Sequence, residues 1–289
     1  MTTTTFSGKT ILVTGGASGI GRDLAAQLSA GGAHVTVADI NETGVHATIE
    51  LLASAARNAG GSLTGVVLDV SDAQAVQTAV DRLVATCGRI DLMFNNAGVS
   101  LGGPTHEMSA THFDHVINVN IRGVVNGVAA AYPHMVRQGN GHIVNTASMA
   151  GLVGPPMTVA YSMTKHAVVG LSTTLRPEAR LHGVRVSVLC PGAVDTPILD
   201  SAPPPDLPAR ATPPLTGREF LALFRATPIA PEEFARRALR AVQRNRAIII
   251  VPEFNRALWY ASRLSPSLTQ FIGNRMARRV VRRIKENPI

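Results

Sequence analysis

The sequence predicts an α/β fold in which a parallel sheet of about seven strands carries helices on both faces. Strand-length apolar runs recur along the chain, and helical patterns lie between them. A glycine-rich turn joins the first run to the first helix. No linker or internal repeat interrupts the alternation, which is the pattern of a doubly wound sheet. The seven runs are residues 9–14, 33–38, 63–69, 90–95, 142–147, 184–190 and 247–251.

The first apolar run is followed by Gly15, Gly19 and Gly21, and then by a helical pattern. In a strand–turn–helix context, glycines let the backbone approach a pyrophosphate, and the helix N-terminus adds free N–H groups and a positive dipole end. The spacing departs from the G-x-G-x-x-G pattern. The segment therefore predicts a dinucleotide phosphate site, with a tight turn that binds no ligand as the alternative.

The second apolar run ends in Asp39, twenty residues after Gly19. A carboxylate at that distance can hydrogen-bond both hydroxyls of an adenosine ribose, whereas a 2′-phosphate would meet like charge. Neither Ser18 nor Ile40 is a cation that would offset this repulsion. Asp39 therefore favours NAD over NADP. As an alternative, Asp39 could merely cap the helix that Asn41 begins.

The segment after the fifth run carries Ser148, Tyr161 and Lys165. On a helix, Tyr161 and Lys165 lie one turn apart on the same face. A phenol has a pKa of about 10, and a fixed ammonium nearby favours the phenolate and brings proton transfer within reach. Ser148 can donate a hydrogen bond to the same reacting oxygen. This set predicts general acid–base chemistry.

Together and in this order, these motifs resemble those of the short-chain dehydrogenase/reductase family, from about residue 9 to about residue 252. The resemblance implies a Rossmann-type fold and an NAD(P)-dependent oxidoreductase that acts on CH–OH groups. It implies four catalytic residues, namely Asn120, Ser148, Tyr161 and Lys165. In the family, the asparagine holds a water that connects the lysine to solvent. No catalytic position departs from the family pattern.

The resemblance also implies the cofactor contacts. The pair Asp69 and Val70 would contact the adenine ring, and Pro191 begins the segment that would hold the nicotinamide. The full set implied is Gly15, Ser18, Gly19, Ile20, Gly21, Asp39, Asp69, Val70, Asn96, Ala97, Gly98, Tyr161, Lys165, Pro191, Gly192, Val194 and Thr196.

A proline-dense region follows the predicted nicotinamide contact, and the family has its substrate lid there. We expect a lid over about residues 196–230, with a disordered surface loop as the alternative. Its apolar side chains suggest that the substrate is an apolar alcohol or ketone. These side chains are Ile198, Leu199, Leu207, Leu215, Phe220, Leu221 and Phe224.

The predicted function is hydride transfer between NAD and an apolar secondary alcohol or ketone, with Tyr161 as general acid and base. One alternative is a 3-oxoacyl thioester reductase, whose acidic carrier would meet a basic tail. A second is a non-catalytic NAD-binding sensor, and a complete catalytic set counts against it. A lyase or epimerase that retains NAD would need a larger C-terminal domain. The resemblance implies a homodimer or homotetramer that pairs through the helices carrying Asn120 and Tyr161.

The chain divides into a dinucleotide-binding and catalytic domain, residues 1–253, and a helical basic extension, residues 254–289. The extension has eight cations and one acid, and so holds +7 of the total charge of +8. Three interpretations remain open: a helix that packs on its own subunit or across an oligomer, peripheral contact with anionic lipid, or nucleic-acid binding. No base-reading module supports the last. An apolar stripe, Ile272, Met276, Val280 and Ile284, follows an aromatic-apolar patch, Phe254, Leu258, Trp259 and Tyr260.

Cys87 and Cys190 are the two cysteines, both in apolar surroundings, which suggests a reduced cytoplasmic protein. No signal peptide is evident, and no apolar run reaches the ~18 residues of a spanning helix. His112 and His115 share a helical spacing, but no third ligand accompanies them. No metal is therefore expected.

Overall fold

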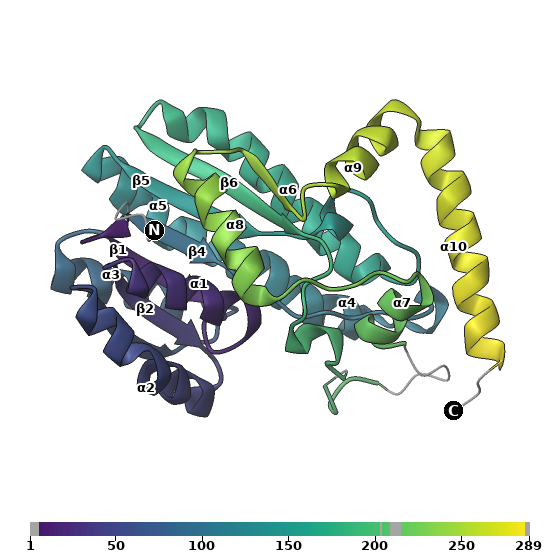
Figure 1. Ribbon diagram of the computed structural model, residues 1–289, viewed down its shortest axis with the longest axis horizontal. Coiled ribbons are helices and arrows are strands. Elements are labelled where there is room, and N and C mark those ends of the chain that lie inside the picture. The colour runs from purple at the N-terminus through teal and green to yellow at the C-terminus, as the bar shows by residue number, and fades with distance from the viewer. Residues whose placement is uncertain (1–5, 203, 209–214, 287–289) are drawn as a thin grey trace.

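One parallel sheet forms the centre of the protein in the computed structural model, which describes residues 6–202, 204–208 and 215–286 (Figure 1). Within these residues the sheet has seven strands in the order β3-β2-β1-β4-β5-β6-β7, which confirms the predicted fold class. The strands are β1 (Thr10–Thr14), β2 (His34–Asp39), β3 (Ser62–Val67), β4 (Leu92–Asn95), β5 (Gly141–Thr146), β6 (Val184–Pro191) and β7 (Ile248–Val251). The central strands are buried along their whole length, as expected for a sheet covered on both faces.

Helices cover both faces of the sheet and form two main cores. The apolar stripes of α1 (Gly19–Ala30), α2 (Glu42–Asn58) and α8 (Pro231–Gln243) pack on one face. Those of α3 (Ala73–Cys87), α5 (Gly123–Gln138) and α6 (Val159–Arg180) pack on the other. In Figure 1, α4 (Ala110–Ile117) and α7 (Gly217–Leu223) both lie toward the same end of the molecule.

The strand order reverses between β1 and β4. In parallel α/β sheets, ligands bind outside the carboxyl ends of the strands at such a point. The hydroxyl of Thr14, at the end of β1, accepts hydrogen bonds from the backbone N–H groups of Asn96 (2.9 Å) and Ala97 (3.1 Å). These bonds fix the glycine-rich turn against the turn that follows β4.

Beyond β7 the chain continues into α9 (Asn255–Leu264) and α10 (Pro266–Glu286), which begin where the basic extension was predicted. In Figure 1, α10 (yellow) runs along the same end of the molecule as α4 and α7. The aromatic ring of Trp259 in α9 packs against the core that contains Cys190 and Ile250. The extension is therefore anchored on the core of the sheet. Among the described residues, we find no candidate for a membrane-spanning helix.

Candidate active site

A single cavity of about 1210 Å³ opens at the point where the strand order reverses, and it gathers nearly all of the predicted site residues. Every predicted cofactor contact lines it, from Gly15 in the first turn to Thr196 after β6. Three of the four predicted catalytic residues also line it, namely Ser148, Tyr161 and Lys165. The fourth, Asn120, is fully buried behind the cavity wall.

The glycine-rich turn has the shape that a pyrophosphate needs. Gly15 and Gly19 adopt positive φ angles of 64° and 48°, which glycine reaches without strain. A Cβ on Gly21 would overlap the carbonyl oxygen of Gly15, so α1 can start this close to β1 only with glycine there. Ser18 caps α1 without a side-chain hydrogen bond to the helix. The first turn of α1 therefore has N–H groups available for an anion, and the residues fit a dinucleotide phosphate.

Asp39 lies between the glycine-rich turn and α2. One carboxylate oxygen accepts a hydrogen bond from the N–H of Ala17 (3.1 Å) and the other from the N–H of Asn41 (3.0 Å). The helix cap itself is Asn41, whose side chain accepts from the N–H of Gly44. The interpretation of Asp39 as the helix cap is therefore wrong, because Asn41 has that role. Asp39 lines the cavity.

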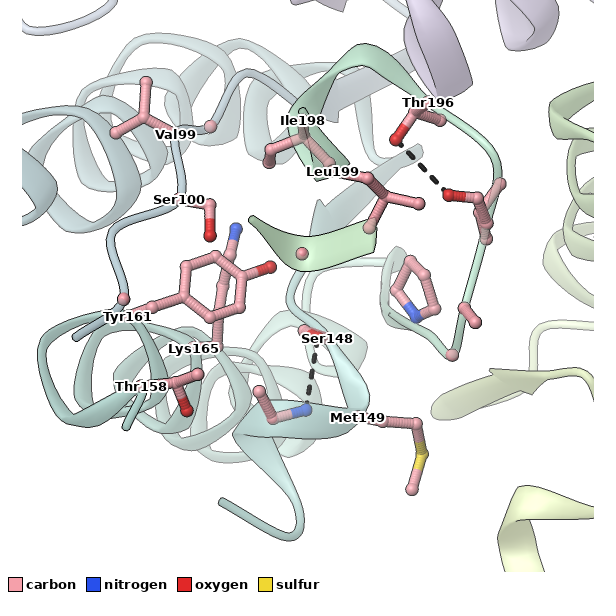
Figure 2. Close-up of a pocket in the computed structure, with 18 of the residues that line it drawn as sticks. Val99, Ser100, Ser148, Met149, Thr158, Tyr161, Lys165, Thr196, Ile198 and Leu199 are labelled. Carbon is pink, nitrogen blue, oxygen red and sulfur yellow. Dashed lines mark hydrogen bonds between the residues drawn. The ribbon is translucent and has the colours of Figure 1, made fainter. Parts of the chain in front are cut away.

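The turn after β5 and the first half of α6 supply the polar groups at the other end of the cavity (Figure 2). Tyr161 and Lys165 lie side by side, and the Lys165 ammonium nitrogen is 5.6 Å from the centroid of the Tyr161 ring. That nitrogen donates to the buried carbonyl oxygen of Thr146 (3.0 Å). The Ser148 hydroxyl oxygen accepts from the N–H of Ala150 (3.1 Å) and faces the phenol across the pocket.

Burial dominates the acid–base properties of this group. It raises the pKa of Tyr161 above its ordinary value, and a hydrogen bond with Ser148 opposes the shift. It lowers the pKa of Lys165 to about 8. It also raises the pKa of the neighbouring Cys190 thiol to about 12, so this cysteine is neutral at pH 7. The sequence predicted a phenol pKa lowered by Lys165, but removal from water has the larger effect here.

Asn120 lies in a π-helical turn, residues Asn118–Arg122, between α4 and α5. Its side-chain oxygen accepts from the N–H of Val99, and its amide nitrogen donates to the Val99 carbonyl (both 2.9 Å). The amide nitrogen also donates to the Thr164 hydroxyl (3.0 Å). These bonds tie the turn after β4 to α6, next to Lys165. The water that the family resemblance assigns to Asn120 stays a prediction.

The predicted lid forms the apolar side of the cavity. Arg218 in α7 bonds to the carboxylates of Asp195 and Asp200, each at 2.8 Å, which fastens α7 to the segment after β6. Leu207 packs instead near Leu101 and Ala160. Residues 203 and 209–214 of the lid lie outside the described residues. The remaining predicted lid side chains line the cavity, namely Ile198, Leu199, Leu215, Phe220, Leu221 and Phe224.

Sequence reasoning missed two sets of lining residues. The first comes from turns, where one sequence gives no signal for burial: Val99, Ser100, Met149, Val153, Pro155, Met157 and Thr158. The second comes from the basic extension: Phe254, Asn255, Leu258, Met276 and Val280. Met276 and Val280 belong to the apolar stripe found in the sequence, so periodicity did reveal an apolar face but not what it packs on. The side chain of Ile284 in that stripe lies outside the described part.

The described residues contain no group of three or more His, Cys, Asp or Glu side chains placed to hold a metal. His112, one of the two histidines weighed as metal ligands from their spacing, is buried. Its ring nitrogen accepts a hydrogen bond from the N–H of Ser109 (3.1 Å). It therefore caps α4. His115 lines the cavity.

Comparison with known proteins gives consistent matches. The family model described as short chain dehydrogenase matches residues 9–206. Levodione reductase of Leifsonia aquatica is 37% identical over 201 residues, which cover 69% of this chain and 74% of that protein. The 2,5-dichloro-2,5-cyclohexadiene-1,4-diol dehydrogenase of Sphingobium indicum is 40% identical over 198 residues, 68% of this chain and 76% of that protein. Among solved structures, a short chain dehydrogenase/reductase of Burkholderia phymatum in complex with NAD matches with a TM-score of 0.81 and 34% identity, covering 91% of this chain and 95% of that one.

Proposed function

Because the chain belongs to the short-chain dehydrogenase/reductase family, which uses NAD or NADP, we propose that it moves a hydride between NAD and an apolar secondary alcohol or ketone. The observation that carries the proposal is that one cavity is lined by both the predicted cofactor-binding residues and the predicted catalytic residues. The glycine-rich turn and Asp39 lie at one end, and Ser148, Tyr161 and Lys165 lie at the other.

In the proposed mechanism, NAD held by the glycine-rich turn and Asp39 would supply the hydride acceptor for alcohol oxidation, and NADH would supply the hydride donor for ketone reduction. Tyr161 takes the hydroxyl proton during oxidation and returns it to the carbonyl oxygen during reduction. Ser148 donates a hydrogen bond to the same oxygen and stabilises the charge that develops on it. Lys165 places its ammonium beside the phenol and favours its ionised form. Asn120 is a positioning residue, since its side chain holds Val99 and Thr164 rather than facing the cavity.

The preference for NAD rests on Asp39. Its carboxylate is held by two backbone N–H groups and lines the cavity at the end of β2. A ribose 2′-phosphate there would meet this negative charge, and neither Ser18 nor Ile40 supplies a cation. The related Burkholderia structure is a complex with NAD, which agrees with the preference.

An apolar substrate is proposed from the side chains that surround the space beside Tyr161. The lid contributes Ile198 and Leu199 above the phenol in Figure 2. Phe220 in α7 and Phe224, which directly follows α7, line the same cavity. The relative from Sphingobium indicum is named for a cyclic secondary diol. A ring or chain of carbon around the reacting carbon would remove these apolar surfaces from water.

The test is to follow nicotinamide absorbance with NAD and with NADP across a panel of secondary alcohols, ketones and a 3-oxoacyl thioester. We expect turnover with NAD, at a kcat/KM at least tenfold higher than with NADP. Tyr161→Phe should lower kcat by about 10²–10⁴-fold, because it removes the proton-transfer group. Its affinity for NADH, measured by fluorescence titration, should stay close to that of the wild type.

Tyr260→Phe is the matched control, because the Tyr260 side chain in α9 is 56% exposed and does not line the cavity. This variant should retain wild-type turnover. Wild-type turnover by Tyr161→Phe would contradict the mechanism. NADH binding without turnover of any alcohol or ketone would favour the sensor alternative, and turnover of the thioester alone would favour the carrier-dependent reductase.

We also propose a cytoplasmic homodimer or homotetramer that contacts an anionic membrane surface. Met163 in α6, which carries Tyr161, and Val125 in α5, which directly follows the π-helical turn that carries Asn120, are exposed apolar side chains. A monomer in analytical ultracentrifugation at micromolar concentration would contradict the oligomer. The membrane contact rests on α9 and α10, where the exposed apolar side chains Tyr260, Leu264 and Phe271 lie among arginines.

A further inference from the structure

The basic extension reaches back to the substrate side of the cavity. After β7, the turn at Pro252 directs the chain into α9, whose Trp259 ring packs on the core. Asn255 lies so close to Gly192 that a side chain on this glycine would overlap its amide. The start of α9 is thus fixed against the segment that follows β6. From there α10 runs past α7 (Figure 1).

One face of α10 is turned toward the cavity. Val280 is 1% exposed and lines the cavity together with Met276, which lies four residues earlier on the same face. Leu258 of α9 completes this apolar surface. Val281, the next residue, points away and is 38% exposed. The two neighbouring valines therefore mark the inner and outer faces of the helix.

A contact between α10 and the lid holds this face in place. The guanidinium carbon of Arg279 lies 5.6 Å from the centroid of the Phe224 ring, within the range of a cation–π interaction. Phe224 lines the cavity together with Phe220 and Leu221 of α7. The aromatic lid and the apolar face of α10 thus enclose one space from two sides, and Arg279 bridges them at its edge.

We propose that α9 and α10 form the distal wall of the substrate site, and that Leu258, Met276 and Val280 bind the part of the substrate that extends beyond the reacting carbon. The proposal rests on the function proposed above and names the substrate class more closely. The substrate is a secondary alcohol or ketone with an extended uncharged hydrocarbon body. This wall lies beyond residue 206, where the match to the family model ends.

The size of the cavity agrees with this substrate. At about 1210 Å³ it exceeds the roughly 300–1,000 Å³ of most small-molecule sites. A dinucleotide at the glycine-rich turn and an extended substrate against α10 would together fill the cavity, one next to the other. Each methylene removed from water by the wall should raise kcat/KM about fourfold, the equivalent of about 0.8 kcal/mol. The increase should stop when the chain of the alcohol reaches Val280.

The experiment measures kcat/KM with NAD for a homologous series of secondary alcohols, from 2-butanol to 2-dodecanol. Val280→Trp fills the distal part of the cavity, so the ratio of long-chain to short-chain kcat/KM should fall at least tenfold. Met276→Ala enlarges the same region and should move the optimum to a longer alcohol. Val281→Trp is the matched control, and its chain-length profile should coincide with that of the wild type.

The outcomes separate this proposal from the proposed function. If 2-butanol is turned over but Val280→Trp and Met276→Ala leave the chain-length profile unchanged, the distal wall is refuted and the oxidoreductase function stands. If no alcohol is turned over, the proposed function fails, and the distal wall is then tested by the binding of a long-chain ketone. In that case 2-dodecanone in the presence of NADH should raise the Tm of the wild type and of Val281→Trp, but not that of Val280→Trp. Equal shifts in all three proteins would refute the wall.

Discussion

At the scale of single residues, the proposed chemistry depends on how far Tyr161 and Lys165 are removed from water. Burial favours the neutral form of each, so the pKa of the phenol is raised and that of the ammonium is lowered to about 8. The Lys165 nitrogen has the carbonyl oxygen of Thr146 as a partner at 3.0 Å, which stabilises its charge. At pH 7 both side chains are protonated, which is the state that the proposed mechanism of ketone reduction requires.

The pH dependence of ketone reduction follows from these shifts. Lys165 is half deprotonated near pH 8, so kcat/KM should be constant only between about pH 6 and 7. As the pH rises further, Lys165 loses its proton first, and kcat/KM should fall about tenfold per pH unit. The measurement is a kcat/KM profile for reduction with saturating NADH from about pH 6 to 10.

Lys165→Arg distinguishes the lysine from other titrating groups. A guanidinium stays charged to about pH 12, so this variant should be slower overall but should have no falling limb near pH 8. Because a guanidinium and an ammonium differ in geometry, the absolute rates of the two proteins are not compared. Only the shapes of their kcat/KM profiles against pH are compared. A limb at the same pH in both proteins would assign the titration to another group.

At the scale of elements, α1 and the turn before it form a unit whose shape is set by close contacts. Gly21 lies where any Cβ would overlap the Gly15 carbonyl, and a Cβ on Gly15 would come 2.8 Å from the Cα of Ala97. The turn after β1, the start of α1 and the turn after β4 are therefore packed backbone to backbone. That packing brings N–H groups to the position that a pyrophosphate would occupy.

Gly21→Ala should therefore damage both cofactor binding and stability. The turn would have to shift to admit the methyl group, so we expect at least a tenfold weaker NADH affinity and a loss of about 1–3 kcal/mol in the free energy of unfolding. Gly170→Ala in α6 is the matched control, because nothing lies within 4 Å of its Cβ position. It should stabilise the protein by about 0.5–1 kcal/mol through helix propensity. Fluorescence titration and urea unfolding provide the two measurements, and wild-type values for Gly21→Ala would contradict the packing argument.

At the scale of the whole molecule, the charge is concentrated at one place. The catalytic domain is close to neutral, and the extension holds +7 of the total charge of +8. The inner face of α10 lines the cavity through Met276 and Val280, so this face is not free to enter a bilayer. The outer surface of the extension is free, and there Leu268 and Phe271 are about half exposed among arginines. Apolar side chains with cations around them are typical of helices that lie on anionic membranes.

The membrane contact predicts co-sedimentation with phosphatidylglycerol vesicles at low salt, but not with phosphatidylcholine vesicles. Reversing two outer charges, Arg275→Glu with Arg282→Glu, should lower the bound fraction at least tenfold, since each cation near an anionic surface contributes about 1 kcal/mol. The control is Arg57→Glu with Arg82→Glu, two exposed arginines on α2 and α3. It has the same net charge and should bind as the wild type does. Equal loss in both double variants would mean that net charge alone, rather than the extension, governs binding.

The sequence by itself determined the seven-strand parallel sheet, and it predicted the cofactor turn and the catalytic set, because short patterns carry each of them. Alternating apolar runs define the layers, and three glycines between a strand and a helix define the turn. The four-residue spacing of Tyr161 and Lys165 puts them on one face of α6 without any knowledge of the rest of the fold. The order of these motifs then identified the family.

Only the tertiary structure decided the properties that depend on residues distant in the chain. The direction of the Tyr161 pKa shift follows from how completely other segments exclude water around the phenol, and spacing does not reveal this. The side chain of Asn120 bonds to Val99 and Thr164, which sequence alone could not pair with it. Periodicity indicated that Met276 and Val280 share an apolar face, but a helix with such a face can pack on its own domain, a partner or lipid. In the structure, this face packs on its own domain, because α9 and α10 run back over the cavity and bury Val280 beside the aromatic side chains of the lid.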